Sequence, residues 1–345
     1  MRKNTLWTLF GILIVSLIWF TPFASASQFN FGVYTVIPEN QIDKQKSYFN
    51  LKMEPSQKQT LTIQLKNDTE DDVIIEPKIH SATTNINGVV EYGPTTAERD
   101  STLPYELGDL IQTDKEIRIP AKGSKELHLN ITMPEEEFNG VLAGGITLEE
   151  KKESPEKTKD TNTGLSIENK YAYVVGITLQ ETDEIVKQDL KLHDVKAGQV
   201  NARNVINATL QNPTATYLNS FEVDAEVTEK GKTEVLYKSK KQDMQVAPNS
   251  NFDYPIQLNG EKFKSGKYTL HVKAKSSKES WEFTKDFTIK GEEAKQFNAK
   301  DVSIDGPSYL AYMVGLLLFL VIGLLVYIFY SKKKIGKEKE QKSND

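Results

Sequence analysis

The residues that could carry catalytic chemistry or bind a metal ion are few and far apart in this sequence. The four histidines are His80, His128, His193 and His271, and none lies within five residues of another. There is no cysteine for a thiol nucleophile, a disulfide or a thiolate metal ligand. HExxH, GxSxG and phosphate-loop patterns are also missing. The sequence therefore predicts a protein that is not an enzyme, with no catalytic residues, no metal site and no cofactor.

Two apolar segments near the ends predict the topology. Arg2 and Lys3 precede an apolar stretch at 6–20, and small residues follow, so residues 1–26 are predicted to be a secretory signal peptide. Residues 309–330 carry no charge and, at about 1.5 Å per residue, are long enough to cross a hydrocarbon core of about 30 Å. The Lys-rich tail at 331–345 then predicts a single-pass protein of the cell membrane, with a cytoplasmic C-terminus and an extracellular segment from 27 to about 308.

Charge and composition constrain what this extracellular segment binds. It carries a net charge of about −10 once the two ends are set aside, and an acidic surface is unsuited to nucleic acid. Without disulfides, the segment must be stabilised by burial of apolar side chains, for which its length is sufficient.

The elements that must position any binding residues are strands. Leu61, Ile63 and Leu65 alternate with polar residues, and Leu127 to Met133 repeat the pattern. Seven further strands are predicted, with a bulge near Lys285, at 190–195, 205–211, 220–228, 235–237, 252–258, 267–274 and 281–289. The predicted fold class is all-β: two tandem immunoglobulin-like β-sandwich domains at 27–182 and 187–290, followed by a linker at 291–308 and one C-terminal transmembrane helix.

A charged segment at 149–163 contains no apolar residue and predicts a mobile loop. Strands are predicted on either side of it, at 140–148 and 171–180. We expect these two strands to pair, which would make the loop an excursion within the first domain. The alternative, that the loop marks the domain boundary, stays open on the sequence alone.

The order of several short motifs resembles that of the WxL-interacting proteins of Gram-positive bacteria. In this sequence they read FGVYTVIPENQ (31–41), YFNLKMEPSQKQTLTIQLKN (48–67), TNINGVVEY (84–92), FNGVLAGGI (138–146), YAYVVGITL (171–179) and VAPNSNFDYPI (246–256). Pro55-Ser56 departs from the Pro-Gly usual in that family. The resemblance implies a peptidoglycan-binding domain, then a host-binding domain, then a membrane anchor. It further implies a cell-surface adaptor whose partners are WxL-domain surface proteins, peptidoglycan and a host extracellular-matrix protein.

Three segments hold the candidate binding residues. The first two offer amides, a hydroxyl, aromatic rings and exposed backbone to a glycan or a protein partner, through Thr84, Asn85, Asn87, Gly88 and Tyr92, and through Phe138, Gly140, Gly144 and Gly145. A structural interpretation is favoured for both: a two-residue Asn-Gly hairpin with positive φ at both residues, and a bulged strand beneath a neighbouring side chain. The third segment is a candidate partner loop in the second domain, Pro248, Asn249 and Ser250, which is also explained as a turn.

A second function class stays open on the sequence. Free edge strands of two sandwich domains could accept a strand of a client, as in an extracytoplasmic chaperone or assembly factor for secreted surface proteins. The charged strand at 222–230 is not expected to be the docking edge.

Overall fold

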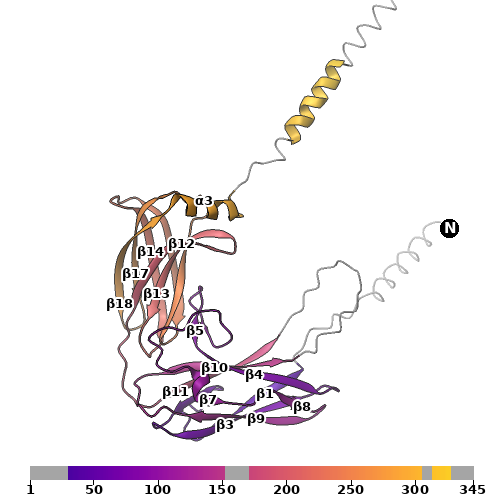
Figure 1. Ribbon diagram of the computed structural model, residues 1–345, viewed down its shortest axis with the longest axis vertical. Coiled ribbons are helices and arrows are strands. Elements are labelled where there is room, and N and C mark those ends of the chain that lie inside the picture. Colours follow the sequence, from indigo (N-terminus) through magenta and orange to yellow (C-terminus); the bar gives the residue numbers. More distant parts are fainter. Residues whose placement is uncertain (1–29, 152–170, 305–312, 328–345) are drawn as a thin grey trace, which may run out of the picture. The chain divides into compact units, whose positions relative to one another are not determined.

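The computed structural model describes residues 30–151, 171–304 and 313–327, and these are mostly β (Figure 1). They divide into two compact units. The first takes in the described residues of Met1–Thr83, Glu91–Lys187 and Thr214–Thr216, and the second those of Thr84–Val90, Gln188–Pro213 and Tyr217–Asp345. Each unit thus includes one short segment that lies, in the sequence, between residues of the other unit.

The first unit consists of two sheets. A four-stranded sheet has the order β1-β3-β9-β7, and a five-stranded sheet has the order β2-β11-β10-β4-β8. The bounds are β1 Phe31–Val36, β2 Phe49–Lys52, β3 Lys58–Asn67, β4 Val73–Ser81, β7 Ile111–Gln112, β8 Ile117–Ile119, β9 Ser124–Thr132, β10 Leu142–Glu150 and β11 Ala172–Gln180. A short helix, α2 (Leu107–Leu110), precedes β7.

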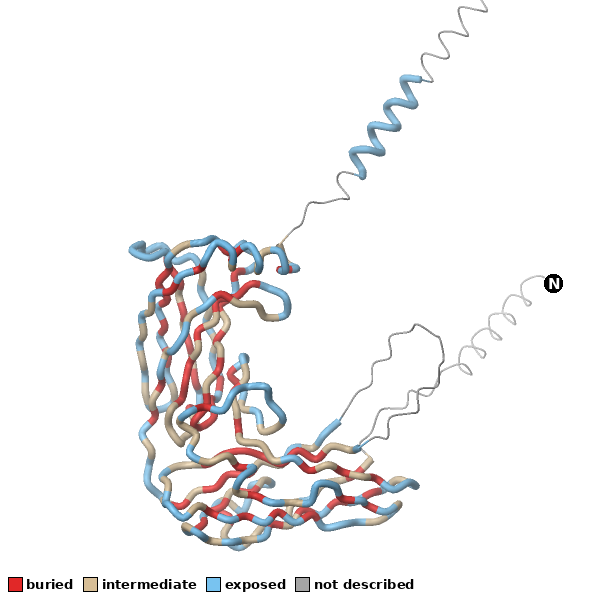
Figure 2. Tube along the Cα trace, in the orientation of Figure 1, coloured by how far each residue is buried: buried red, intermediate tan, exposed pale blue. Residues whose placement is uncertain are grey.

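Strict alternation of burial separates the two faces of the four-stranded sheet. Leu61, Ile63 and Leu65 of β3 are at most 1% exposed, and the apolar residues of β9 are equally buried, while the polar residues between them face outward. The alternation is visible as red and blue segments along these strands (Figure 2). Burying one such side chain contributes about 1.5–3 kcal/mol, so this inner face holds the unit together. The strands predicted from the alternating pattern are confirmed.

The predicted pairing across the charged loop is also confirmed. β10 and β11 run antiparallel from Leu142↔Leu179 to Glu149↔Ala172. β2 in turn pairs in parallel with β11, starting at Phe49↔Ile177. β11 therefore joins β2 to the rest of the five-stranded sheet. Most of the predicted loop, and all of the predicted signal peptide, lie outside the described residues.

The second unit also consists of two antiparallel sheets, ordered β12-β13-β16 and β15-β14-β17-β18. The bounds are β12 Lys191–Val200, β13 Arg203–Asn212, β14 Leu218–Glu229, β15 Val235–Val246, β16 Ser250–Gln257, β17 Gly266–Lys275 and β18 Ser280–Ile289. Phe221, Tyr254 and Leu270 are among the most deeply buried residues of its core. All seven predicted strands are present, but β15 is far longer than the predicted 235–237, because its mostly polar sequence hides the strand pattern.

Two expectations for the end of this unit are wrong. No bulge interrupts β18 near Lys285: β17 and β18 stay in register from Gly266↔Ile289 to Lys275↔Ser280. Lys285 lies on the same face as Phe283 and Phe287, and its ammonium group donates a hydrogen bond to the His193 carbonyl. The charged Lys285 is therefore accommodated between Phe283 and Phe287 without any change of register.

The predicted linker at 291–308 begins instead with a helix, α3 (Gly291–Lys300). Ala294 is buried, and the Phe297 ring lies 5.8 Å from that of Phe263. The Asp301 carboxylate after the helix accepts hydrogen bonds from the N–H groups of Asn204 (2.8 Å) and Ser303 (2.7 Å). The segment is therefore part of the second unit's packing.

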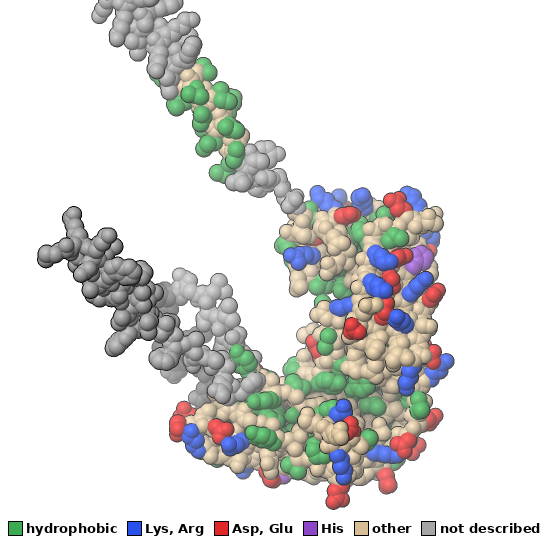
Figure 3. Space-filling model, turned by 180° about the vertical axis from the view of Figure 1, so that it is seen from behind, with side chains coloured by type: hydrophobic (Ala, Val, Ile, Leu, Met, Phe, Trp, Pro, Cys, Tyr) green, Lys and Arg blue, Asp and Glu red, His purple; other side chains and the backbone are tan. Residues whose placement is uncertain are grey.

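The predicted transmembrane segment, 309–330, is described at 313–327. These residues are helical and exposed, with hydrophobic side chains around the helix (Figure 3). Among the described residues, no helix has the length and apolarity that crossing a membrane requires.

The charged strand considered as a protected edge is in fact internal. β14 lies between β15 and β17, and Glu222 at its start accepts from Lys240 and Lys275, each at 3.0 Å. Basic and acidic side chains are mixed in this way over the visible face of the second unit (Figure 3). Hydrogen bonds from Lys275 and Lys240 lower the pKa of Glu222 to about 2.

Glu222 should make the stability of the second unit depend on pH. Because its folded pKa lies below the ordinary value of 4.5, its stabilisation is complete above pH 4.5 and is lost as the pH falls towards 2. Urea unfolding at a series of pH values should show a smaller acid loss of stability for Glu222→Gln than for the unchanged chain. Glu234→Gln is an exposed control that keeps the Glu222 ion pairs, and it should lose as much stability in acid as the unchanged chain. Equal acid sensitivity in all three proteins would contradict the role given to Glu222.

Candidate binding surfaces

The first predicted binding segment forms a hairpin of β5 (Thr83–Thr84) and β6 (Val90–Glu91). Gly88 has a φ of +66°, but Asn87 is not among the positive-φ residues, so the predicted two-residue loop with both residues at positive φ is wrong. The Gly88 N–H donates to the Asn85 carbonyl (2.8 Å), and the Asn85 N–H donates to the Val89 carbonyl (3.0 Å). This is the three-residue hairpin, in which a turn is followed by one left-handed residue, usually glycine.

This hairpin packs within the second unit. The Gly88 carbonyl accepts from the Gln245 N–H of β15 (2.9 Å), and a Cβ on Gly88 would lie 2.4 Å from the Met244 Sδ. The Asn87 amide oxygen accepts from Lys241 Nζ (3.3 Å). Of this segment's candidates, Gly88 is therefore a packing residue, while Asn87 stays exposed.

The predicted partner loop of the second domain is buried rather than presented to a partner. Thr84 and Ser250 share a hydrogen bond between their hydroxyls (2.9 Å), and Thr84 also accepts from the Ala247 N–H (2.9 Å). Asn249 has a φ of +47° and donates from its amide to the Pro213 carbonyl (3.1 Å). Pro248 is buried as well. The structure thus brings two predicted sites together, as one internal contact.

The glycine pair of the second segment permits close packing within the first unit. A Cβ on Gly144 would lie 2.2 Å from the His80 carbonyl oxygen, and one on Gly145 would lie 2.9 Å from the Cβ of Tyr92. The register on both sides of β10 is continuous here, so the predicted bulge is absent, but the predicted close approach and the overlying side chain are present. The Tyr92 side chain thus occupies the space beside Gly145.

Phe138 and Gly140 are likewise held by internal contacts. The Phe138 N–H donates to the Glu181 carboxylate (2.8 Å), and its ring lies 6.3 Å from Tyr105. Burial raises the pKa of Glu181, while the hydrogen bond from Phe138 acts in the opposite direction. Gly140 has a φ of +90°, and a Cβ there would lie 2.3 Å from the Ala215 carbonyl oxygen.

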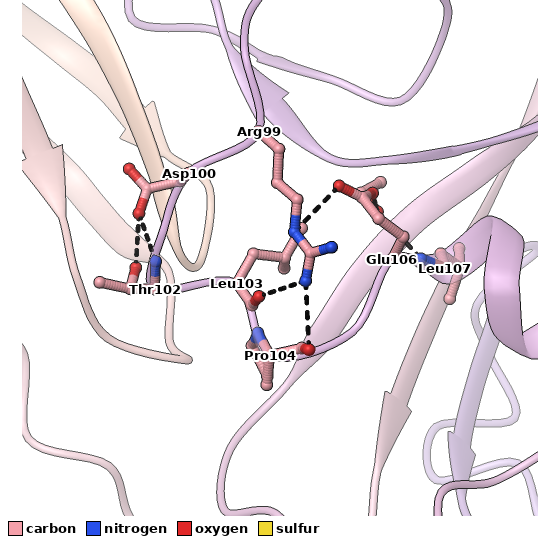
Figure 4. A network of polar contacts seen from close by, with 8 residues as sticks. Arg99, Asp100, Thr102, Leu103, Pro104, Glu106 and Leu107 are labelled. Atoms are coloured by element: carbon pink, nitrogen blue, oxygen red, sulfur yellow. Dashed lines mark hydrogen bonds and ion pairs between the residues drawn. The ribbon is translucent and has the colours of Figure 1, made fainter.

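A polar network on the segment before α2 has a structural role of the same kind (Figure 4). The Arg99 guanidinium donates to the Leu103 carbonyl (2.8 Å) and lies 3.5 Å from the Glu106 carboxylate. Glu106 accepts from the Ser81 hydroxyl (2.5 Å), which itself accepts from the Leu107 N–H (3.0 Å). The network joins the start of α2 to the end of β4.

The four histidines lie on four strands, β4, β9, β12 and β17, and the described residues contain no cluster of three side chains suited to a metal ion. Burial and then the Lys78 ammonium lower the pKa of His80. The half-buried His80 therefore favours the neutral form.

Two grooves remain open, and of the predicted binding residues only Asn87 lines one of them. In the first unit, a groove of about 820 Å³ lies on the outer face of the four-stranded sheet and includes Tyr34, Gln64 and His128. In the second unit, a groove of about 950 Å³ includes Asn87 and Arg203. The alternating pattern could have indicated the groove of the first unit, because every second residue of such a strand faces outward and can contact a ligand.

Substitution of Gly88 should show that the hairpin is a packing element. Gly88→Ala and Gly231→Ala both place a side chain at positive φ (+66° and +80°), but no atom lies within 4 Å of a Cβ at Gly231. The difference between the two variants therefore isolates the contact with Met244. In urea unfolding, Gly88→Ala should cost about 1–3 kcal/mol more than Gly231→Ala, the range typical of overpacking. Equal losses would show that the hairpin does not pack tightly here.

Several solved structures are distantly similar to this chain. The Class 5 fimbriae chaperone CfaA is 14% identical, with a TM-score of 0.30, over 74% of this chain and 99% of that one. The E. coli chaperone DraB is 15% identical, with a TM-score of 0.27, over 75% and 98%. The CsuC–CsuE chaperone–tip adhesion subunit complex of Acinetobacter baumannii is 11% identical, with a TM-score of 0.31, over 74% of this chain and 98% of that one. Nothing about fold or function follows from similarity this low, and no curated protein sequence matches the chain.

Two family models match consecutive parts of the chain. The peptidoglycan binding domain of the WxL Interacting Protein matches residues 31–150, and the host binding domain of the same family matches residues 162–299. The order agrees with the order of motifs in the sequence, and together the matches cover most of both units. The chain belongs to the WxL Interacting Protein family, with a peptidoglycan-binding domain followed by a host-binding domain.

Proposed function

We propose that this WxL Interacting Protein is a membrane-anchored adaptor on the cell surface, which holds WxL-domain proteins against peptidoglycan and also binds a host extracellular-matrix protein. The observation that carries the proposal is the pair of consecutive family matches, one named for the wall polymer and one for the host. The signal peptide and the span at 309–330, both proposed from the sequence, would place these domains outside the membrane.

The mechanism is noncovalent. A chain tethered at one end and bound to the wall through one domain presents its second domain at high local concentration, so two weak sites can give firm attachment. The described surface of the first unit fits this role, because its groove lies on the outer face of a sheet whose inner face forms the core.

We also propose that the first domain extends past the match at 31–150 to the end of β11, with boundaries at 27–182, and that the second, at 187–290, is immunoglobulin-like. β11 supports this division, since it pairs with β10 along eight residue pairs and is the strand that β2 joins. The seven strands of the second unit, arranged three against four, support the immunoglobulin-like assignment.

The boundary can be tested with two fragments. Fragment 30–150 lacks β11, which leaves β2 and one edge of β10 without their partner strand, whereas fragment 30–187 keeps the five-stranded sheet. We expect 30–150 to aggregate or to unfold at much lower urea concentration, because unpaired edges and an uncovered core face are exposed. Equal stability of the two fragments, measured by circular dichroism, would place the boundary at the charged loop instead.

The adaptor function can be tested with the full-length chain in detergent micelles. We expect insoluble peptidoglycan to sediment the chain, and a WxL-domain protein to co-purify with it as a complex that survives gel filtration. If wall fragments fail to retain the chain while the WxL-domain protein is captured, the peptidoglycan part is wrong. If the WxL-domain protein binds only briefly and is released, an assembly factor explains the chain better than an adaptor.

A further inference from the structure

The outer face of β1, β3 and β9 brings together side chains from three strands that are distant in sequence. The register aligns Tyr34 with Gln64 and Gln64 with Glu126, which gives one row across the sheet. The next outward row ends in His128 on β9. We call this surface the Tyr34 face; it consists of Tyr34, Gln64, Lys66, Ser124, Glu126 and His128, which line the groove of about 820 Å³ together with Asp114.

An exposed aromatic ring lies along this surface. The Tyr34 side chain is 59% exposed. A Cβ on Gly32 would lie 3.3 Å from Tyr34 Cε2 and 3.5 Å from its hydroxyl oxygen. The hydroxyl end of the ring therefore lies over Gly32, two residues back along the strand, where the missing side chain leaves room. The ring therefore extends along the sheet surface, and more than half of the residue is exposed.

Polar groups of several kinds surround the ring. Gln64 offers an amide that both donates and accepts, and Glu126 offers a carboxylate whose oxygen lies 3.9 Å from His128 Nε2. His128 Nδ1 lies 3.4 Å from the Thr62 hydroxyl, a contact that orients the imidazole. Lys66 forms an ion pair with Asp68 at 2.9 Å.

We propose that the Tyr34 face is the surface on which the first domain binds the glycan strand of peptidoglycan. This inference rests on the proposed function and assigns the wall-binding site within it. A strand of N-acetylated amino sugars offers C–H faces for the Tyr34 ring and hydroxyl and acetamido groups for Gln64, Glu126 and His128. The groove volume falls within the range of about 300–1,000 Å³ usual for ligand sites.

A glycan fits this face better than a protein does. Protein interfaces have an apolar centre that excludes water, but the outward positions around Tyr34 are almost all polar or charged, with Val36 as the apolar exception. Every lining residue also falls within 31–150, the part that matches the peptidoglycan-binding model.

Three variants of the full-length chain in detergent micelles separate the contributions of the Tyr34 ring, its hydroxyl group and its position over Gly32. Tyr34→Ala removes the ring, and its affinity for insoluble peptidoglycan, measured by sedimentation, should fall about tenfold, since one aromatic contact is of that order. Tyr34→Phe keeps the ring and should bind within about twofold of the unchanged chain. Gly32→Val keeps Tyr34 but places branched carbons against the ring, and should also lose binding. Tyr171→Ala, which removes an exposed tyrosine away from the groove, is the matched control.

The outcomes distinguish this proposal from the proposed function. Equal retention of Tyr34→Ala and the unchanged chain would overturn the site while leaving wall binding intact. No retention of any protein, including the unchanged chain, would instead refute peptidoglycan binding itself. Loss of a WxL-domain partner with unchanged wall retention would show that the face binds protein, and would overturn the proposal. Unchanged melting temperatures show that the variants are folded; if Tyr34→Ala fails this check, Gly32→Val decides.

Discussion

Burial of one face of each sheet is the constraint on which this protein depends. With no cysteine to cross-link it, the chain must obtain its stability from apolar residues at every second strand position, as in β3 and β9. Each strand thus commits one face to the core. The opposite face of each sheet remains available for recognition, and its exposed rings and amides can contact a ligand.

This constraint explains why the motifs that look most distinctive in the sequence lie mostly in internal contacts, with Asn87 as the exposed exception. Glycines, an Asn-Gly pair and a Pro-Asn-Ser turn suggest places where a backbone could approach a ligand. In the structure they approach other parts of the chain: Gly88 lies against Met244, Gly145 lies beneath Tyr92, and Thr84 bonds to Ser250. Distinctive residues at tight contacts are as readily explained by packing as by binding.

The sequence was sufficient for the strands, because a period of two marks a half-buried strand directly. It failed where burial is weak or the contact is distant. β15 is an edge strand with many polar residues, so that its length could not be recognised. α3 shows only Ala294 and Phe297 as inward-facing apolar residues, too few to reveal a helix. The packing of the 84–90 hairpin in the second unit depends on residues more than 150 positions away, and no local pattern records it. The Tyr34 face was missed because its members are ordinary outward residues of three separate strands, which only the register brings together.

Side-chain footprinting with hydroxyl radicals, on the full-length chain with and without peptidoglycan fragments, tests most directly whether an outer sheet face carries the binding. Tyr34 and His128 should become protected when fragments are added, while Tyr92 and Phe138 keep the reactivity that their internal packing gives them. Protection of Tyr92 and Phe138, with Tyr34 unchanged, would contradict this assignment and would place the binding site at the segments 84–92 and 138–146.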